Sequence, residues 1–257
     1  MLILSIDTSG KQGSVALSRG DAKRFELIEC VPVGGVTFSA QLVPQIAKLL
    51  AGHNFTKEQI DVFAAASGPG SLTGLRVGLA AIKGLAEVLH KPVVTVSVLQ
   101  AVASTALATQ GIWEADAKAN VLAVLDAGRG EFYAGEYKFG EPLPELVKES
   151  IFTADELAQF IKRRGQKLAL ITPDPAAISS VKSLLSDPYL LWAQTIERPN
   201  AATTAQLGLH KLLRREIISV EELDANYIRR SDAEIFSLPK TAAPRKSTAS
   251  REPADQC

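Results

Sequence analysis

The first half of the sequence contains a pattern that returns in the second half, and this repeat constrains the fold more than any other feature. Residues 2–21, LILSIDTSGKQGSVALSRGD, read as an apolar strand that ends at Asp7, a glycine-containing turn, a second strand and a glycine–acid turn. Residues 120–141, NVLAVLDAGRGEFYAGEYKFGE, follow the same order, with Asp126 in the place of Asp7. Hairpins with acidic ends are common, so a chance similarity is the alternative. We favour a duplicated α/β fold, because alternating helical and strand-like segments follow each hairpin.

The helices and strands expected after each hairpin predict where the two domains begin and end. In the first half we expect a third strand at 23–31, helices at 38–50, 73–89 and 98–109, and strands at 62–67 and 91–97. In the second half we expect helices at 154–164, 176–185 and 202–215 and strands at 167–172 and 189–193. The predicted domains are residues 1–108 and 109–216, followed by a segment at 217–238 that packs back and a disordered, proline-rich and polar tail at 239–257.

Composition narrows the function classes. Lys and Arg together number 28, as do Asp and Glu, so the net charge is zero. A chain that holds nucleic acid by itself usually has a basic excess, so another subunit is expected to supply most phosphate contacts. The two cysteines lie far apart, and no apolar run approaches the roughly 18 residues of a membrane span. These features predict a cytoplasmic protein that contacts no membrane.

A glycine-rich stretch at residues 66–84, ASGPGSLTGLRVGLAAIKG, joins an expected strand to an expected helix. Unpaired backbone N–H groups at such a helix start favour anions. The P-loop pattern fails here, because it would need glycine at Thr73 or Leu75, and the dinucleotide pattern fails at Thr73. Within the helix, Gly74, Gly78 and Ala81 make a groove of small residues, which predicts a close neighbour. That neighbour is either the sheet of the same chain or the helix of a partner.

Candidate catalytic groups are few. None of His53, His90 and His210 falls in a metal-ligand motif, and the sequence has no nucleophile elbow and no plausible cysteine nucleophile. Asp7 and Asp126 could hold Mg²⁺ if the two halves face each other, whereas an aspartate that caps its own turn is the alternative reading of Asp7. A loop that approaches phosphate closely favours glycine, because a Cβ keeps the backbone away from the phosphate oxygens. This chain has Ser9 at that position, which argues against nucleotide binding there.

Several motifs together resemble the TsaB family, also called YeaZ. They are ILSIDTS and GSVAL near the start, the block ASGPGSLTGLRVGLAAIKGLA, then PVVTVSVLQAVA, LDAGRGEFYAGEY and NYIRRSDAE, and they span roughly residues 2–236. The resemblance implies two tandem ribonuclease-H-like domains of the actin/Hsp70/sugar-kinase superfamily. It also implies a role in forming N6-threonylcarbamoyladenosine (t6A) at position 37 of tRNAs that read codons starting with A.

In that family the transferase chemistry belongs to a paralogue, TsaD, and the TsaB-like chain is a non-catalytic subunit that dimerises with TsaD and activates it. The resemblance further implies a homodimer in isolation, a TsaE-type ATPase as a third component, indirect contact with tRNA, and no cofactor of the chain's own, with ATP or ADP and Mg²⁺ at the complex interface. The alternative from the wider superfamily is an active ATP-dependent phosphotransferase that uses Asp7.

The resemblance also assigns residues. No catalytic residue and no metal ligand is expected. The partner-binding residues are expected on the helix after the glycine stretch and on the helix before it: Gly74, Leu75, Arg76, Gly78, Leu79, Ala81, Ile82, Lys83, Leu42 and Ile46. The candidate nucleotide loop comprises Asp7, Thr8, Ser9, Gly68, Gly70 and Ser71. Many members have a His-Ser-Glu run where this chain has Phe38-Ser39-Ala40, so a role for that His or Glu does not transfer.

Overall fold

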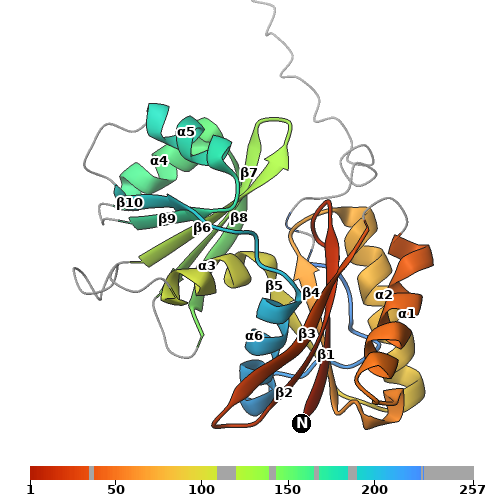
Figure 1. Ribbon diagram of the computed structural model, residues 1–257. Helices are drawn as coiled ribbons and strands as arrows, with labels where there is room; N and C mark the ends of the chain where they lie inside the picture. Colours follow the sequence, from red (N-terminus) through yellow and green to blue (C-terminus); the bar gives the residue numbers. More distant parts are fainter. Residues whose placement is uncertain are drawn as a thin grey trace, which may run out of the picture.

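The computed structural model contains two units, each built on one five-stranded sheet (Figure 1). It describes residues 1–34, 38–108, 120–138, 143–164, 168–184, 190–226 and 228. The expected mixed α/β class is confirmed. In the described part of the chain, no helix is both long enough and apolar enough to cross a membrane.

The described elements of the first half follow the order expected from the sequence. They are β1 (Leu2–Asp7), β2 (Gly13–Gly20), β3 (Phe25–Val33), α1 (Phe38–Gly52), the short 3-10 helix η2 (Lys57–Gln59), β4 (Val62–Gly68), α2 (Leu72–Leu89), β5 (Val93–Ser97) and α3 (Val98–Ala108). The sheet order is β3-β2-β1-β4-β5. β1 is antiparallel to β2 and parallel to β4.

The second half repeats this arrangement. Its elements are β6 (Asn120–Gly128), β7 (Glu131–Lys138), β8 (Glu145–Thr153), α4 (Ala154–Arg164), β9 (Leu168–Thr172), α5 (Pro175–Leu184), β10 (Leu190–Thr195) and α6 (Ala201–Leu213). The sheet order β10-β9-β6-β7-β8 is the first order with each strand replaced by its counterpart. β6 is again antiparallel to the second strand of its unit and parallel to the fourth.

The repeat extends to the turns that follow the first strand of each unit. The backbone N–H of Ser9 donates to Oδ1 of Asp7 at 2.8 Å, and that of Gly128 donates to Oδ1 of Asp126 at 2.7 Å. Both are aspartate turns in which the side chain satisfies the N–H two residues on. Asp7 and Asp126 therefore have the same local structure, and chance similarity of the two hairpins does not account for it.

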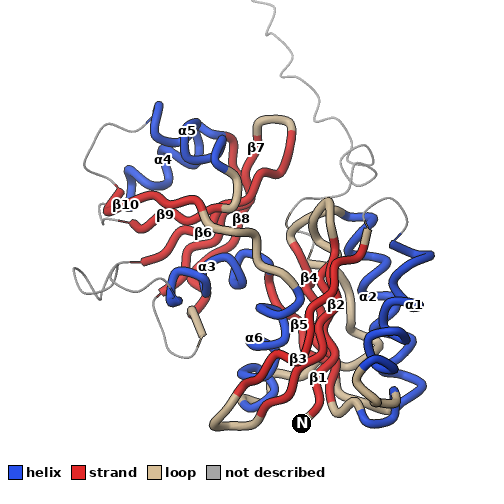
Figure 2. The backbone as a smooth tube through the Cα atoms, in the orientation of Figure 1, coloured by secondary structure: helices blue, strands red, loops and turns tan. Residues whose placement is uncertain are grey.

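Alternate side chains of the central strands pack into two separate hydrophobic cores, one on each face of the sheet. Leu4 and Ile6 of β1 face the core under α1 and α2, whereas Ile3 faces the core under α6. Because each sheet is covered on both faces, its central strands are apolar along their whole length instead of alternating with polar residues. Figure 2 shows the same layers, with helices on both sides of each set of strands.

The two units exchange a helix, which corrects the division made from the sequence. α3, assigned to the first unit, packs mainly against β6 and β7, and α6, assigned to the second, packs mainly against β1 and β2. Leu99 and Val102 of α3 lie in a core with Val121, and Leu209 of α6 lies in the core with Ile3. Periodicity shows that a helix has an apolar face, but it does not show which sheet that face covers.

The segment after α6 returns along the first unit, as expected for residues from 217 onward. The C-terminal strap, as residues 217–226 are called below, is mostly loop in Figure 2. Ile218 forms an antiparallel bridge with Val93, and Leu223 and Ala225 are buried in the core that α1 and α2 cover. The backbone N–H of Asn226 donates to the carbonyl of Ser67 at 2.7 Å. The predicted disordered tail at 239–257 lies outside the described residues.

Candidate functional site

The glycine-rich stretch forms a tight turn and the first residues of α2. The turn carries a cis peptide bond between Gly68 and Pro69. Ser71 is the N-cap of α2, and its hydroxyl accepts a hydrogen bond from the N–H of Gly74 at 3.2 Å. The N–H of Ser71 donates to the carbonyl of Ser9 at 2.8 Å. The helix start is therefore satisfied in part by its own cap and in part by the loop after β1.

Three glycines let that loop lie directly on α2. A Cβ built on Gly70 would lie 2.4 Å from the carbonyl oxygen of Ser9, and one on Gly74 would lie 2.1 Å from that of Thr8. At Gly78 it would lie 2.3 Å from the hydroxyl oxygen of Thr8. These distances are far below van der Waals contact. The small-residue groove therefore accommodates the Thr8–Ser9 loop of the same chain.

This packing places most of the predicted partner contacts inside the chain. The members that are buried in the chain's own first unit are Gly74, Leu75, Gly78, Leu79, Ile82, Leu42 and Ile46. While the first unit is folded, these residues present almost no surface to a partner. Arg76 is exposed, and Ala81 and Lys83 are half-buried. Helical spacing identified the apolar and small faces correctly, but it could not tell which face turns toward the sheet.

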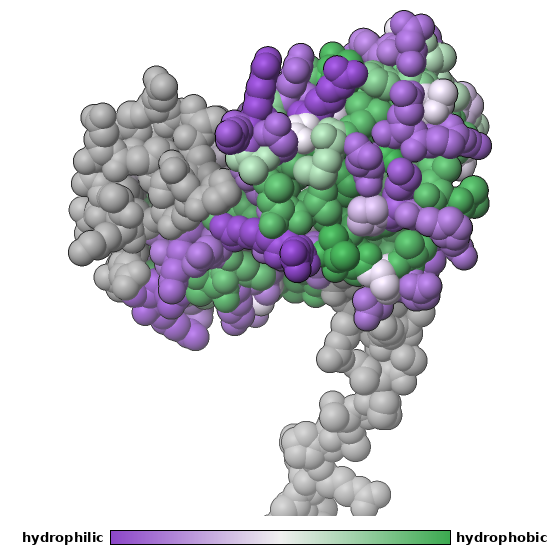
Figure 3. All heavy atoms as spheres, turned by 90° about the horizontal axis from the view of Figure 1, so that it is seen from below, coloured by the Kyte–Doolittle hydropathy of each residue, from purple (hydrophilic) through white to green (hydrophobic). Residues whose placement is uncertain are grey.

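The outward face of α2 carries a different stripe of small residues. Thr73, Ala80 and Gly84 are exposed along it, and a Cβ on Gly84 would have nothing within 4 Å. Val88, four residues after Gly84 on the same helix, is 73% exposed, and Val43 on the neighbouring helix α1 is 56% exposed. We call Thr73, Ala80, Gly84, Val88 and Val43 the outward face. Seen from below, the surface of the first unit shows apolar areas between polar side chains (Figure 3).

The candidate nucleotide loop is brought together but is filled by the chain itself. Thr8 and Ser9 are buried, and they pack on Gly70 and Ser71 at the start of α2. At the start of α2, the N–H of Ser71 therefore donates to a carbonyl of the chain's own loop, and the N–H of Gly74 donates to the Ser71 hydroxyl. Of the six predicted residues, Asp7 lines a cleft between the two units.

That cleft has a volume of about 730 Å³ and lies between the two units. Asp7, Gly10 and Cys30 line the cleft from the first unit. Asp174, which follows β9, and Arg198, which follows β10, line it from the opposite side. Nε of Arg198 would lie 3.1 Å from a Cβ on Gly10, so the guanidinium group extends across the loop that follows β1. Sequence reasoning missed Arg198, since nothing in the local pattern at residues 196–200 distinguishes it from a surface arginine.

Burial is the main influence on Asp7. It raises the pKa of this carboxyl group, and hydrogen bonding from Ser9 and the positive charge of Arg198 oppose the rise. Asp126 is exposed instead, and its backbone N–H donates to Oδ2 of Asp174 at 2.9 Å. The two equivalent aspartates thus share a turn but differ in environment. Within the described residues, no cluster of three or more His, Cys, Asp or Glu side chains has a metal-ligating arrangement.

Asp7 gives a pH-dependent prediction. Because its pKa is higher in the folded chain than in the unfolded chain, the folded state loses stability as pH rises from about 3.9 through the folded pKa. Asp7→Asn keeps an oxygen that can accept the Ser9 N–H and removes this loss. We expect the Tm of Asp7→Asn to exceed that of wild type at neutral pH, and the gap to close in acid, as measured by thermal melts. Asp126→Asn is the matched control, and a pH-independent gap for Asp7→Asn would contradict the explanation.

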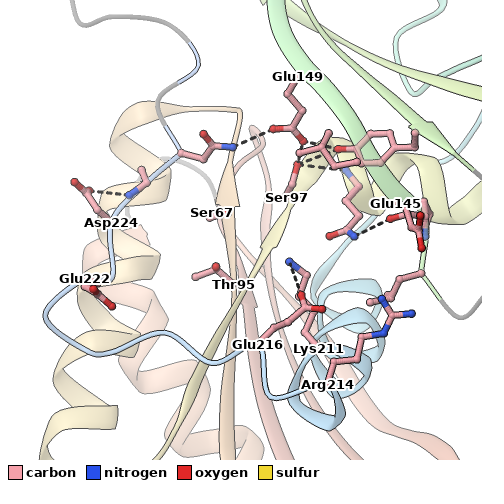
Figure 4. Close-up of a pocket in the computed structure, with 17 residues that line it drawn as sticks. Ser67, Thr95, Ser97, Glu145, Glu149, Lys211, Arg214, Glu216, Glu222 and Asp224 are labelled. Atoms are coloured by element: carbon pink, nitrogen blue, oxygen red, sulfur yellow. Dashed lines mark hydrogen bonds and ion pairs between the residues drawn. The ribbon is translucent and has the colours of Figure 1, made fainter. Parts of the chain in front are cut away.

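A second cavity, of about 640 Å³, lies on the other side of the boundary between the units. Glu149 of β8 accepts hydrogen bonds there from Ser97, Tyr137 and Asn226, which come from β5, β7 and the C-terminal strap (Figure 4). Lys211 of α6 and Arg214, which directly follows this helix, form another wall, and Glu222 and Asp224 of the strap form a third. One carboxylate therefore joins the second unit to the first unit and to the strap.

Comparison with known proteins identifies the family. Residues 33–184, more than half of the chain, match the family model described as TsaD, tRNA N6-adenosine threonylcarbamoyltransferase. The chain belongs to this family. Several curated relatives carry the name TsaB, "tRNA threonylcarbamoyladenosine biosynthesis protein", so the resemblance to TsaB (YeaZ) proteins is confirmed.

The relatives match over most of their length. The Bacillus subtilis protein is 27% identical over 237 residues, which cover 91% of this chain and 96% of the relative. The Haemophilus influenzae protein is 26% identical and is matched over 94% of its length. Among solved structures, YeaZ from Pseudomonas aeruginosa aligns with a TM-score of 0.70 at 24% identity, covering 88% of this chain and 99% of that one. The structural likeness shows a shared fold.

Proposed function

We propose that this chain is a non-catalytic subunit of the machinery that forms t6A at position 37 of tRNA, and that it acts by binding and activating a TsaD-type transferase. The proposal includes two ribonuclease-H-like units, a cytoplasmic location, a TsaE-type ATPase as a further component and a homodimer when the partner is absent. The names of the curated relatives support the pathway. The outward face supports the mode of action.

The observation that carries the proposal is the outward face itself. A helix with exposed Thr73, Ala80 and Gly84 allows the backbone of another helix to approach closely. The exposed Val88 on α2 and Val43 on the neighbouring helix α1 add apolar area, of the kind that marks interaction sites. We therefore transfer the predicted partner contact from the buried side of α2 to this side. Arg76, Ala81 and Lys83, which are exposed or half-buried, lie on the same helix.

The cleft supports a chain without chemistry of its own. The guanidinium group of Arg198 supplies a positive charge near Asp7, which disfavours a second cation such as Mg²⁺ at that carboxylate. The loop after β1, which would hold phosphates in a phosphotransferase, instead packs on the start of α2. In this proposal, any ATP or ADP with Mg²⁺ binds at the boundary with the partner and not within this chain alone.

Arginine substitutions on the outward face test the proposal. Ala80→Arg and Gly84→Arg should each weaken association with the host's TsaD homologue by about 100-fold or more, because an unpaired charge buried in the interface costs about 3 kcal/mol. Association is measured by size-exclusion chromatography with light scattering, and t6A formation by a tRNA modification assay with both proteins present.

Ala176→Arg is the matched control, since Ala176 is an exposed alanine on α5, the counterpart of α2 in the second unit. It should leave association and modification unchanged. Normal complex formation by both outward-face variants, with Tm values like wild type, would refute the assigned surface. ATP turnover by the purified chain that disappears in Asp7→Ala would refute the non-catalytic role.

A further inference from the structure

A hollow of about 420 Å³ lies in the second unit, between α4 and the edge strand β8. Its lining comes from β8 and from one face of α4: Lys148, Ile151, Phe152, Glu156, Gln159, Phe160 and Arg163. The four α4 residues fall at helical spacing, so they form one continuous stripe beside the strand. The hollow is separate from both cavities between the units.

Two aromatic rings form the apolar part of the hollow. The ring centroids of Phe152 and Phe160 lie 5.3 Å apart, with the planes inclined by 38°. Both side chains are half-buried at the margin of the core under α4 and α5. Packing on one side fixes the rings, and the exposed remainder faces the hollow. Fixed, partly exposed aromatic rings are the surfaces on which unpaired nucleic-acid bases stack.

Positive charge surrounds these rings. Lys148 and Arg163 line the hollow, and Lys162 and Arg164 lie beside Arg163 in the last turn of α4. The guanidinium group of Arg164 lies 5.8 Å from the ring centre of Phe160, although it also pairs with the buried Glu136. The one lining carboxylate, Glu156, accepts hydrogen bonds from the N–H and hydroxyl of Thr153. These hydrogen bonds hold the Glu156 carboxylate toward Thr153, and with two lining cations against one lining carboxylate the balance around the hollow is basic.

We propose that this hollow binds an unpaired nucleotide of RNA, with its base against Phe152 and Phe160 and its neighbouring phosphates at Lys148 and Arg163. Bases use both features of the site, the rings and the cations, whereas an acidic peptide would use only the cations. The family's transferase model is described by its action on a tRNA adenosine. Two phosphate contacts suit a chain with zero net charge, because they supply weak, accessory binding.

This proposal rests on the proposed function only in taking the RNA to be tRNA. Binding of RNA to the hollow is therefore tested first on the full chain without its partner. Fluorescence anisotropy with a labelled single-stranded RNA oligonucleotide should show salt-dependent binding. Phe160→Leu should weaken it about fivefold or more, because one stacking ring is lost while apolar packing is kept. Lys148→Gln with Arg163→Gln should reduce the slope of log K against log salt by about 0.7 for each lost contact.

Lys23→Gln with Lys57→Gln, two exposed lysines of the first unit, is the matched control and should leave binding and slope unchanged. Thermal melts confirm that the variants fold. Unchanged affinity in both hollow variants would overturn the proposal. So would equal displacement of the RNA by polyglutamate and by polyuridylate, since that result indicates an acidic protein partner.

Association with the TsaD homologue separates this proposal from the proposed function. Both hollow variants should bind that partner as wild type does, but should lower the affinity of the assembled complex for tRNA. Loss of partner binding in Ala80→Arg with RNA binding by the chain intact would leave the hollow assignment standing. Failure of RNA binding with intact partner association would overturn only the hollow.

Discussion

Gly74→Ala should lower the free energy of unfolding by about 3 kcal/mol or more, which is a large effect for the addition of one methyl group. The added Cβ would lie 2.1 Å from the carbonyl oxygen of Thr8, and this oxygen belongs to backbone that is held by the hydrogen bond between Ser71 and Ser9. The loop after β1 would have to leave the helix, and the buried Thr8 and Ser9 would then be exposed. Urea unfolding followed by circular dichroism measures the change.

Gly84→Ala is the control on the same helix. Its Cβ would have nothing within 4 Å, so only helix propensity changes, and the variant should gain about 1 kcal/mol. The two substitutions are chemically identical and differ in sign only because of what lies next to each glycine. Equal effects would show that the close packing of the Thr8–Ser9 loop on α2 is not a stabilising feature. Gly78 lies against the Thr8 side chain and should behave like Gly74, so it is unsuitable for testing a partner surface.

Much of the fold could be predicted, because its signals are local. The hairpin of residues 2–21 and its counterpart at 120–141 predicted a repeated α/β architecture, and the structure repeats both the strand order and the aspartate turn. Helices from α1 to α6 begin and end close to where apolar spacing placed them. What local signals could not supply is which sheet each helix covers, and α3 and α6 were assigned to the wrong units for that reason.

The candidate surface could be predicted only in part. The pattern of Gly74, Gly78 and Ala81 predicted close approach, and close approach occurs at both glycines. The identity of the neighbour depends on where the loop after β1 lies, which is set by contacts between residues far apart in the sequence. Arg198 and Glu149 were missed for the same reason, since each acts across the boundary between the units. The stripe at Thr73, Ala80 and Gly84 was present in the sequence but was indistinguishable from the buried stripe before burial was known.

Removal of the C-terminal strap by truncation is the second change for which we expect a large loss of folding stability. A chain that ends at Glu216 lacks Leu223 and Ala225, which are only 6% and 8% exposed, and lacks the Ile218 bridge to Val93. We expect a loss of about 4 kcal/mol or more, since a buried leucine alone contributes about 2 kcal/mol and the hydrogen bond of Asn226 to Ser67 adds to it. Thermal and urea unfolding measure the loss.

A chain that ends at Ile228 is the control, and it should be as stable as the full chain because the strap is intact. Comparison of the two truncated chains also tests whether the strap supports α2, the helix that carries the outward face. Nζ of Lys83 on α2 donates to the carbonyl of Glu221 in the strap at 3.3 Å, and Asn226 bonds to Glu149 of the second unit at 3.1 Å. The strap thus lies beside α2 on one side and reaches the second unit on the other. If the shorter chain is as stable as the longer one, the strap is not part of the core, and the sheet, the Thr8–Ser9 loop and α1 are enough to hold α2 in place.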